Sequence, residues 1–180
     1  MTNITIRPVD NASDPAITSI HRLYHESFPK EERRPWDMLT GLIESQMPYF
    51  KLFAAQDGNG CFVGFISRWT LPGAYYIEHF AVEHDRRSNG AGGCILDNIL
   101  RDSSDRPVVL EVELPDANVD APRRIAFYNR HGFKAMDDFV YFQPPYAPGL
   151  PDVQLMLMTT KSLDDPKAFT VMLHTLVYNQ

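Results

Sequence analysis

The segment EHFAVEHDRRSNGAGGCILDNIL, residues 78–100, brings three glycines together between a strand pattern and a helix pattern. The first N–H groups of a helix have no partners within the helix, and the helix dipole is positive at that end. Main-chain donors there can hold an anion such as a pyrophosphate, provided that no side chain obstructs it. Gly90 and Gly92 give that clearance, so this loop is predicted to bind a phosphate-bearing ligand.

Two common phosphate-binding motifs do not fit this loop. A P-loop needs a lysine and a hydroxyl residue after its last glycine, whereas Gly93 is followed by Cys94 and Ile95. A dinucleotide fingerprint that starts at Gly90 needs a third glycine where Ile95 stands, and its first glycine should follow the strand almost directly. Both motifs are therefore excluded.

The elements that would position this loop follow from hydrophobic periodicity. Apolar residues recur at helical spacing over 17–28, 36–43, 94–100, 123–131 and 166–177, and strand patterns cover 4–8, 51–56, 61–71, 74–82, 108–114, 133–142 and 153–160. Turn residues between the second, third and fourth strands predict consecutive antiparallel hairpins. The strand, helix and strand that follow predict a right-handed parallel crossover. The chain is thus expected to be α/β, with a sheet that mixes antiparallel and parallel pairs.

The segment RSNGAG, residues 87–92, resembles the CoA-binding motif R/Q-x-x-G-x-G/A of the GNAT superfamily. The segment FYNRHGF, residues 127–133, resembles the family's later signature, and the order of elements from residue 4 to about 160 agrees with the family fold. The resemblance implies a GNAT acyl-CoA N-acyltransferase fold, with a central mixed twisted sheet and helices on both faces. It implies an acetyltransferase domain over 1–160. The apolar stripe of the last helix pattern predicts a helical extension over 161–180, packed on the domain or on the second subunit of a homodimer.

The same resemblance implies transfer of an acetyl group from acetyl-CoA to a primary amine, by direct attack in a ternary complex. In this family the fourth strand splays from the fifth at a bulge, and its free backbone groups hold the pantetheine arm. Val82 would direct its N–H to the thioester oxygen, and Arg87 would add charge beside the pyrophosphate. The cofactor-binding residues that the resemblance implies are Phe80, Ala81, Val82, Arg87, Ser88, Asn89, Gly90, Ala91 and Gly92.

Two side chains are candidates for the catalytic proton transfers. Tyr128 occupies the family's usual general-acid position and would donate to the departing CoA sulfur; alternatively, it only forms a pocket wall. Glu78 lies two residues before Phe80 and is therefore expected on the same strand face, where it would act as a base or as an anionic anchor for a cationic substrate. His79 is expected on the opposite face, in a structural role.

Two further carboxylates lie on the next strand. Glu111 and Glu113 share one strand face, and carboxylates among valines and leucines are costly unless they face solvent or a polar cleft. Each is expected either to face the acceptor or to form an ion pair with Arg123 or Arg124 of the following helix.

Two segments leave their roles open. The loop FPKEERRP, residues 28–35, is expected to be exposed, and a part in choosing the acceptor is a hypothesis. The family's asparagine seven residues before Tyr128 is Ala121 in this chain, so its contact to the pantetheine arm cannot be assumed. Asn118 is a candidate replacement from the longer loop.

The composition favours a soluble protein whose partner is a cation. The chain has 180 residues, with 17 basic and 23 acidic side chains, a net charge of -6 and no basic cluster. No nucleic acid or membrane partner is therefore expected, whereas a small-molecule or peptide amine is. No segment matches a signal peptide or a membrane helix, so a cytoplasmic location is expected.

The cysteines exclude a disulfide framework. Cys61 and Cys94 are too few for that or for a zinc site, and both are expected to be buried, reduced thiols. No metal is expected. The alternative function is a non-catalytic acyl-CoA-binding sensor or partner-recruiting module of the same fold, since a fold does not fix a function. The sequence leaves the acceptor amine and the acyl-chain preference open.

Overall fold

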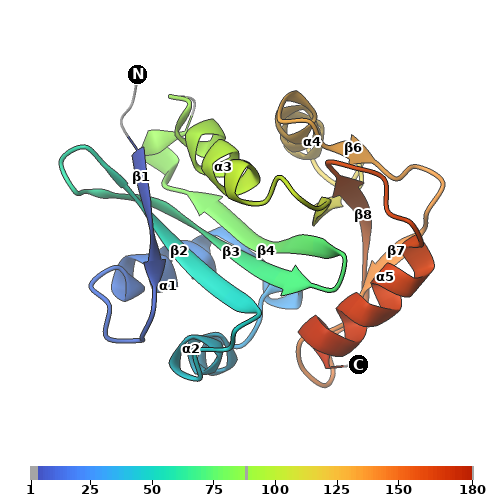
Figure 1. Ribbon diagram of the computed structural model, residues 1–180, viewed down its shortest axis with the longest axis horizontal. Helices are drawn as coiled ribbons and strands as arrows, with labels where there is room; N and C mark the ends of the chain where they lie inside the picture. The colour runs from blue at the N-terminus through green and yellow to red at the C-terminus, as the bar shows by residue number, and fades with distance from the viewer. Residues whose placement is uncertain (1–3, 88, 180) are drawn as a thin grey trace.

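A computed structural model describes residues 4–87 and 89–179, and in this part the strands form one eight-stranded sheet of order β1-β2-β3-β4-β5-β8-β6, with β7 also paired to β8 (Figure 1). The strands are β1 (Ile4–Val9), β2 (Phe50–Asp57), β3 (Phe62–Leu71), β4 (Ala74–Val82), β5 (Val108–Glu113), β6 (Lys134–Ala135), β7 (Tyr141–Gln143) and β8 (Val153–Thr159). The β4–β5 pair is parallel and the other pairs are antiparallel, which confirms the predicted mixed α/β sheet.

Helices cover both faces of this sheet (Figure 1). They are α1 (Ile17–Ser27), α2 (Trp36–Glu44), α3 (Ala91–Asp102), α4 (Ala121–Arg130) and α5 (Pro166–Leu173), with short helical turns η1 (Lys30–Glu32), η2 (His84–Arg86) and η3 (His174–Tyr178). Buried side chains of α1, α2, α5 and η3 form one core, whereas those of α3 and α4 form a second core on the opposite face. We call these the α1 face and the α3 face.

The C-terminal helix packs on the chain's own sheet. Asp165 caps it by accepting from the N–H groups of Lys167 and Ala168, both at 3.0 Å, as its sequence position indicates. Phe169 and Leu173 are buried in the core of the α1 face. The helix is therefore part of the wall on that side of the sheet.

The predicted strand over 133–142 is wrong in its length. The structure forms only β6 and β7 there, separated by a turn in which the Phe139 N–H donates to the Met136 carbonyl at 3.0 Å. Asp137 and Asp138 occupy this turn, and aspartate is depleted in strands because its side chain competes for backbone hydrogen bonds. The apolar residues on either side hid this break.

The expectation of two buried thiols is also wrong. Cys61 is exposed because it follows the tight turn between β2 and β3, where its N–H donates to the Asp57 carboxylate at 3.0 Å. Cys94 lies in the first turns of α3 and is partly buried. Both are free thiols.

Candidate active site

The sheet opens between its two parallel strands. β4 and β5 pair at three positions only, Tyr75 with Val108, Tyr76 with Val109 and Ile77 with Leu110. Beyond them lies a cavity of about 710 Å³, whose wall includes residues of both strands, of α1 and its following loop, and of α3 and α4. The cavity therefore joins the α1 face to the α3 face at the point where the strands separate.

A bulge in β4 determines which face of the sheet each side chain occupies at this opening. Ile77 pairs with Arg68 and Phe80 with Ile66, so β4 has one more residue than β3 between these pairs. Ile77 and Phe80 both pack in the α3-face core. The extra residue places both Glu78 and His79 on the other side of the sheet.

The predicted faces of Glu78 and His79 are therefore wrong. Glu78 does not share a face with Phe80; its carboxylate lies on the α1 face, with Trp69 and Tyr146. His79 is on that same face, where its ring packs edge-on against Tyr24. Strict alternation along a strand fails here because the bulge inserts a residue.

The backbone after the bulge faces the cavity. The N–H of Glu83 donates to the Val63 carbonyl of β3 at 2.9 Å. Because neighbouring residues of a strand direct their N–H groups to opposite sides, the N–H of Val82 points away from β3, toward the opening. Phe80, Ala81 and Val82 all line the cavity. These three residues thus lie along one wall, and the Val82 N–H is a backbone donor directed toward the cavity.

The glycine loop forms the neighbouring wall. Gly90 has φ +78, a left-handed conformation that favours glycine, and a Cβ there would meet nothing within 4 Å. Helix α3 follows without a side-chain cap, and the N–H of Cys94 donates to the Gly90 carbonyl at 3.0 Å. The N–H groups of Ala91, Gly92 and Gly93 precede that first helical bond, so they are the donors of a helix start that have no partner within the helix.

The other residues predicted for this loop are Arg87, Ser88 and Asn89. Arg87 lines the cavity and donates from Nε to the Val82 carbonyl at 3.0 Å, which ties the loop to the end of β4. Asn89 is exposed. Ser88 lies outside the described residues. The loop thus offers main-chain donors and one guanidinium beside the cavity.

The carboxylate of Glu78 is enclosed, with 0% of its side chain exposed. Its Oε1 accepts from Arg34 at 2.7 and 3.0 Å and from the Tyr146 hydroxyl at 2.9 Å, and its Oε2 accepts from the Trp69 indole at 2.7 Å. Burial opposes ionisation, but the charge of Arg34 and the hydrogen bonds lower the pKa of Glu78 below its usual value. This carboxylate is a weak base and fixes its neighbours in place.

The sequence suggests that Arg34 belongs to an exposed loop, but the structure buries its side chain. Only 2% of its side chain is exposed, and it also donates to the Val177 carbonyl at 2.7 Å, which links the loop after α1 to the C-terminal turn. Its guanidinium lies 5.0 Å from the centre of the Tyr146 ring. Nothing in the sequence separates Arg34 from Arg33 beside it, because the difference comes from which side of the chain faces the sheet.

Tyr128 lies on α4 at the rim of the cavity, on the α3 face. It is buried, with 8% of the residue exposed, and its ring packs against Phe127 and Phe133. Burial raises the pKa of Tyr128 to about 12, so the phenol remains protonated at neutral pH. A protonated phenol at this place can donate to a leaving group in the cavity.

Glu113 and Glu111 have different partners. Glu113 forms an ion pair with Arg124, which confirms that alternative for this residue. Glu111 forms no ion pair among the described residues; instead it accepts hydrogen bonds from the hydroxyls of Tyr141 and Tyr178. For Glu111 the alternative of an ion pair with Arg123 or Arg124 is therefore wrong. Burial raises its pKa to about 7.

Asn118 holds the start of α4. Its Oδ1 accepts from the N–H groups of Asp120 and Ala121, both at 3.0 Å, as an N-terminal capping side chain does. Ala121 is fully buried beneath it. This acceptor is thus engaged in the helix start and is not free to replace an asparagine contact to a ligand.

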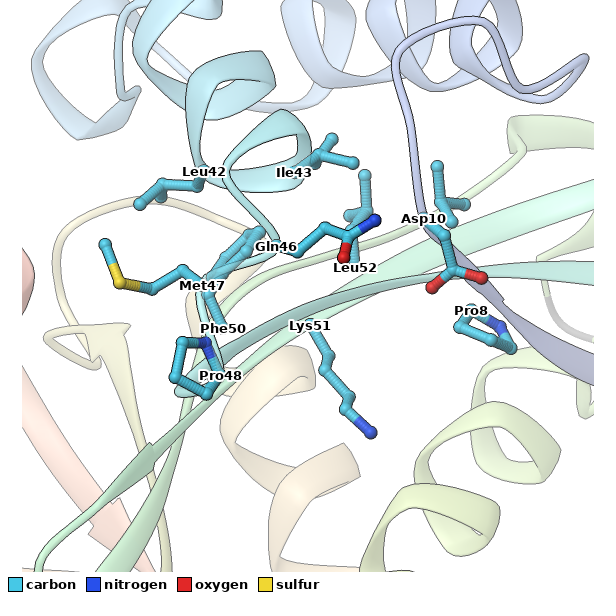
Figure 2. A pocket seen from close by; sticks show the side chains of 11 residues that line it. Pro8, Asp10, Leu42, Ile43, Gln46, Met47, Pro48, Phe50, Lys51 and Leu52 are labelled. Carbon is cyan, nitrogen blue, oxygen red and sulfur yellow. The ribbon is translucent and has the colours of Figure 1, made fainter.

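A second, smaller pocket of about 350 Å³ lies between the end of α2 and the β1–β2 edge (Figure 2). Figure 2 shows Met47 and Pro48 on one side and Pro8 and Asp10 on the other, with Gln46 between them. The lining is mostly apolar and holds no paired acid and base. The larger cavity at the β4–β5 opening is therefore the candidate active site.

Residues 4–87 and 89–179 hold no group of three His, Cys, Asp or Glu side chains placed to bind a metal ion. In the same part of the chain, each helix is too short or too polar to cross a membrane.

The fold is that of an α/β protein with a cavity at an opening in the sheet, beside a helix start. Comparison with family models matches residues 48–135 to the acetyltransferase (GNAT) domain. Among solved structures, a protein of Bacteroides thetaiotaomicron assigned to the GNAT acetyltransferases is 34% identical, with a TM-score of 0.87 over 98% of this chain and 99% of that one. The chain therefore belongs to the GNAT family, and it is an acetyltransferase.

More distant structures share the fold. A GNAT acetyltransferase from Elizabethkingia anophelis with acetyl-CoA bound is 17% identical, with a TM-score of 0.58 over 89% of this chain and 99% of that one. The spermidine/spermine N-acetyltransferase SpeG of Vibrio cholerae, in complex with manganese ions, is 16% identical, with a TM-score of 0.63 over 87% and 91%. Among curated proteins, none matches the chain significantly. These findings do not favour the non-catalytic alternative.

Proposed function

We propose that this acetyltransferase takes its acetyl group from acetyl-CoA and passes it to a primary amine by direct attack, with both substrates bound in the β4–β5 cavity. The observation that carries the proposal is the opening itself, which is lined on one wall by β4 backbone and on the next by the uncapped start of α3. A ligand with an extended amide-bearing arm and a pyrophosphate matches these two walls.

The residues proposed to hold acetyl-CoA are those of the β4 end and the glycine loop. Phe80, Ala81 and Val82 would bind the arm through their backbone, with the Val82 N–H directed to the thioester oxygen, where negative charge develops during attack. Arg87 and the N–H groups of residues 88–92 would bind the pyrophosphate. Because Gly90 has open space around it, this loop accommodates phosphate oxygens close to its backbone.

Tyr128 is the proposed general acid. Its phenol would donate a proton to the sulfur as the thioester bond breaks, and its raised pKa keeps the proton available at neutral pH. Glu78 was predicted as a base or an anchor. Since its carboxylate is enclosed and paired with Arg34, we propose that Glu78 acts as a positioning residue that holds Tyr146 and the bulge.

The charges around the cavity support a cationic acceptor. On the α3 face the lining carries Arg123, Arg130 and His131, which suit phosphates. On the α1 face it carries Glu26 and Glu32, and these two carboxylates suit an ammonium group. This division supports binding of the anionic substrate on the α3 face and of the amine on the α1 face. A small-molecule amine and a peptide amine remain alternatives within this proposal.

A thiol-release assay with acetyl-CoA and a panel of primary amines tests this function. We expect release of free CoA that depends on the amine, with an N-acetylated product detected by mass spectrometry. Tertiary amines of matched charge are the control, because they cannot form an amide. Binding of acetyl-CoA without amine-dependent release across the panel would instead support the sensor.

The proposal includes three features of organisation. Residues 1–160 form the catalytic domain, with 161–180 as an extension packed on it, as the burial of Phe169 and Leu173 supports. A homodimer would cover the exposed side chains of Val171 and Leu176 on this extension. A cytoplasmic location is supported by the two free thiols. Sedimentation of the full chain as a monomer would exclude the dimer.

A further inference from the structure

Glu111 differs from Glu78 and Glu113, the other carboxylates that β4 and β5 contribute to the cavity wall, in having no arginine partner. Glu78 is paired with Arg34 and Glu113 with Arg124, whereas no ion pair among the described residues includes Glu111. Glu111 is the first residue of β5 after Leu110, which forms the last pair with β4. It therefore lies where the two strands begin to separate. A buried carboxylate without a cation is costly, which calls for an explanation.

Tyrosine hydroxyls hold this carboxylate in one orientation. Tyr178 donates to Oε1 at 3.0 Å or Oε2 at 2.8 Å, and Tyr141 also donates to Oε1. Behind them, the Tyr76 hydroxyl lies 3.0 Å from that of Tyr178. Tyr178 has one hydroxyl hydrogen, so when it donates along the shorter distance to Oε2 each carboxylate oxygen has one tyrosine donor, and a carboxylate oxygen can accept more than one hydrogen bond. Oε2 has capacity for a donor from the cavity.

Titratable groups from four segments face Glu111. β4 contributes Tyr76 and the charge of Glu78, β7 contributes Tyr141, η3 contributes Tyr178, and the loop after β7 contributes Tyr146 further away. These neighbours are hydroxyls or another carboxylate. Their effect is to orient Glu111 without neutralising it, and burial with the nearby negative charge raises its pKa to about 7. Glu78, by contrast, has a lowered pKa.

We propose that Glu111 is the proton acceptor for the amine, and that Tyr178 of the C-terminal turn positions its carboxylate at the opening between β4 and β5. The inference rests on the proposed function and adds to it a catalytic residue on β5. The acceptor it implies is a primary alkylammonium ion that reaches Oε2 from the α1 face. The turn that follows α5, η3, is thereby part of the active site.

The proton balance is as follows. Glu111 takes one proton from the ammonium nitrogen, whose lone pair then forms the C–N bond to the thioester carbon. The C–S bond breaks, and Tyr128 donates its proton to the sulfur. The second proton lost by the nitrogen restores the Tyr128 phenol, and Glu111 releases its proton to water. The products are the amide and the free thiol, with one proton released overall.

The test compares Glu111→Gln, Glu113→Gln and Tyr178→Phe with the wild type, from pH 5 to 9, using the best amine of the panel. Loss of a general base lowers kcat by about 10²-fold or more, so Glu111→Gln should lose that much and also the acidic limb of the kcat/KM profile near pH 7. Glu113→Gln, which removes a carboxylate with its own arginine, should keep the limb. Acetyl-CoA affinity and thermal unfolding confirm that each variant is folded.

Tyr178→Phe distinguishes a role of Tyr178 in positioning the Glu111 carboxylate from a general loss of structure. Removing a hydrogen bond to the ionised form raises a carboxyl pKa, so the acidic limb should move to higher pH by about 1 unit, since one such bond is worth about 1 kcal/mol. The proposal is overturned if Glu111→Gln keeps the limb, raises KM alone, or if the limb does not move in Tyr178→Phe. If the wild type releases no thiol with any amine, the proposed function fails first.

Discussion

Replacing Arg34 by Met leaves the Glu78 carboxylate buried without its cation. Breaking a buried ion pair from one side costs about 3–5 kcal/mol. Because Trp69 and Tyr146 still donate to this carboxylate, we expect the lower end, about 3 kcal/mol of unfolding free energy at pH 7. For a domain of this size that lowers Tm by about 6–12 °C. Denaturant unfolding followed by circular dichroism measures the loss.

The sign of the pH dependence makes this prediction specific. In the wild type the pKa of Glu78 is lowered, so the pair stabilises the fold above the ordinary pKa of 4.5 and this contribution is lost as pH falls through the folded value. In Arg34→Met burial is opposed only by the remaining hydrogen bonds, without the charge of Arg34, and we expect the folded pKa of Glu78 to rise above 4.5. The variant is then penalised at neutral pH and relieved on acidification, so the difference from wild type shrinks toward pH 4.

Two further variants control the experiment. Arg33→Met removes the neighbouring arginine, whose contacts are backbone carbonyls on a partly exposed surface, and should change stability by about 0.5 kcal/mol at most. The double variant Arg34→Met with Glu78→Gln carries no unpaired charge and should regain stability over Arg34→Met alone. A loss below 1 kcal/mol in Arg34→Met, or a loss independent of pH, would refute the reasoning.

The other predictions concern single side chains. Tyr128→Phe should lower kcat about 10²-fold with little change in acetyl-CoA affinity by titration, whereas a mere pocket wall would leave kcat nearly intact. Gly90→Ala should cost about 1 kcal/mol because its φ of +78 is left-handed, while Gly41→Ala in α2 should gain up to about 1 kcal/mol; denaturant unfolding compares them, and equal effects would contradict the strain. The raised pKa of Glu111 makes the wild type lose stability as the pH rises from 4.5 to 7, because the unfolded carboxyl ionises first, whereas Glu111→Gln cannot titrate there. The stability of Glu111→Gln relative to the wild type should therefore rise by up to about 3 kcal/mol over this range. A difference that stays constant with pH would contradict the raised pKa.

The sequence predicts the parts of this site that depend on local pattern. Alternation and helical periodicity placed the strands and helices, and the spacing of Gly90 and Gly92 located the start of α3. These features depend on neighbours in the chain, which is why one sequence is sufficient for them. The family resemblance added the roles of Val82 and Tyr128, which stay predictions.

The features it missed depend on contacts between distant segments. One additional residue in β4 turned Glu78 to the α1 face, and no residue type at that position signals a bulge. Arg34 is buried because it forms an ion pair with Glu78, which lies 44 positions later in the chain. The tyrosines around Glu111 come from β7 and η3, so the different surroundings of Glu111 and Glu113 are visible only once these elements are assembled.

The measurement that tests the central claim most directly is calorimetric titration of acetyl-CoA and CoA into the wild type, Gly90→Glu and Gly73→Glu. Both glycines have left-handed φ with nothing within 4 Å, but Gly73 lies in the β3–β4 turn, away from the cavity lining. We expect the wild type and Gly73→Glu to bind both ligands and Gly90→Glu to bind neither. Binding that survives in Gly90→Glu, or that is absent from the wild type, would contradict the account.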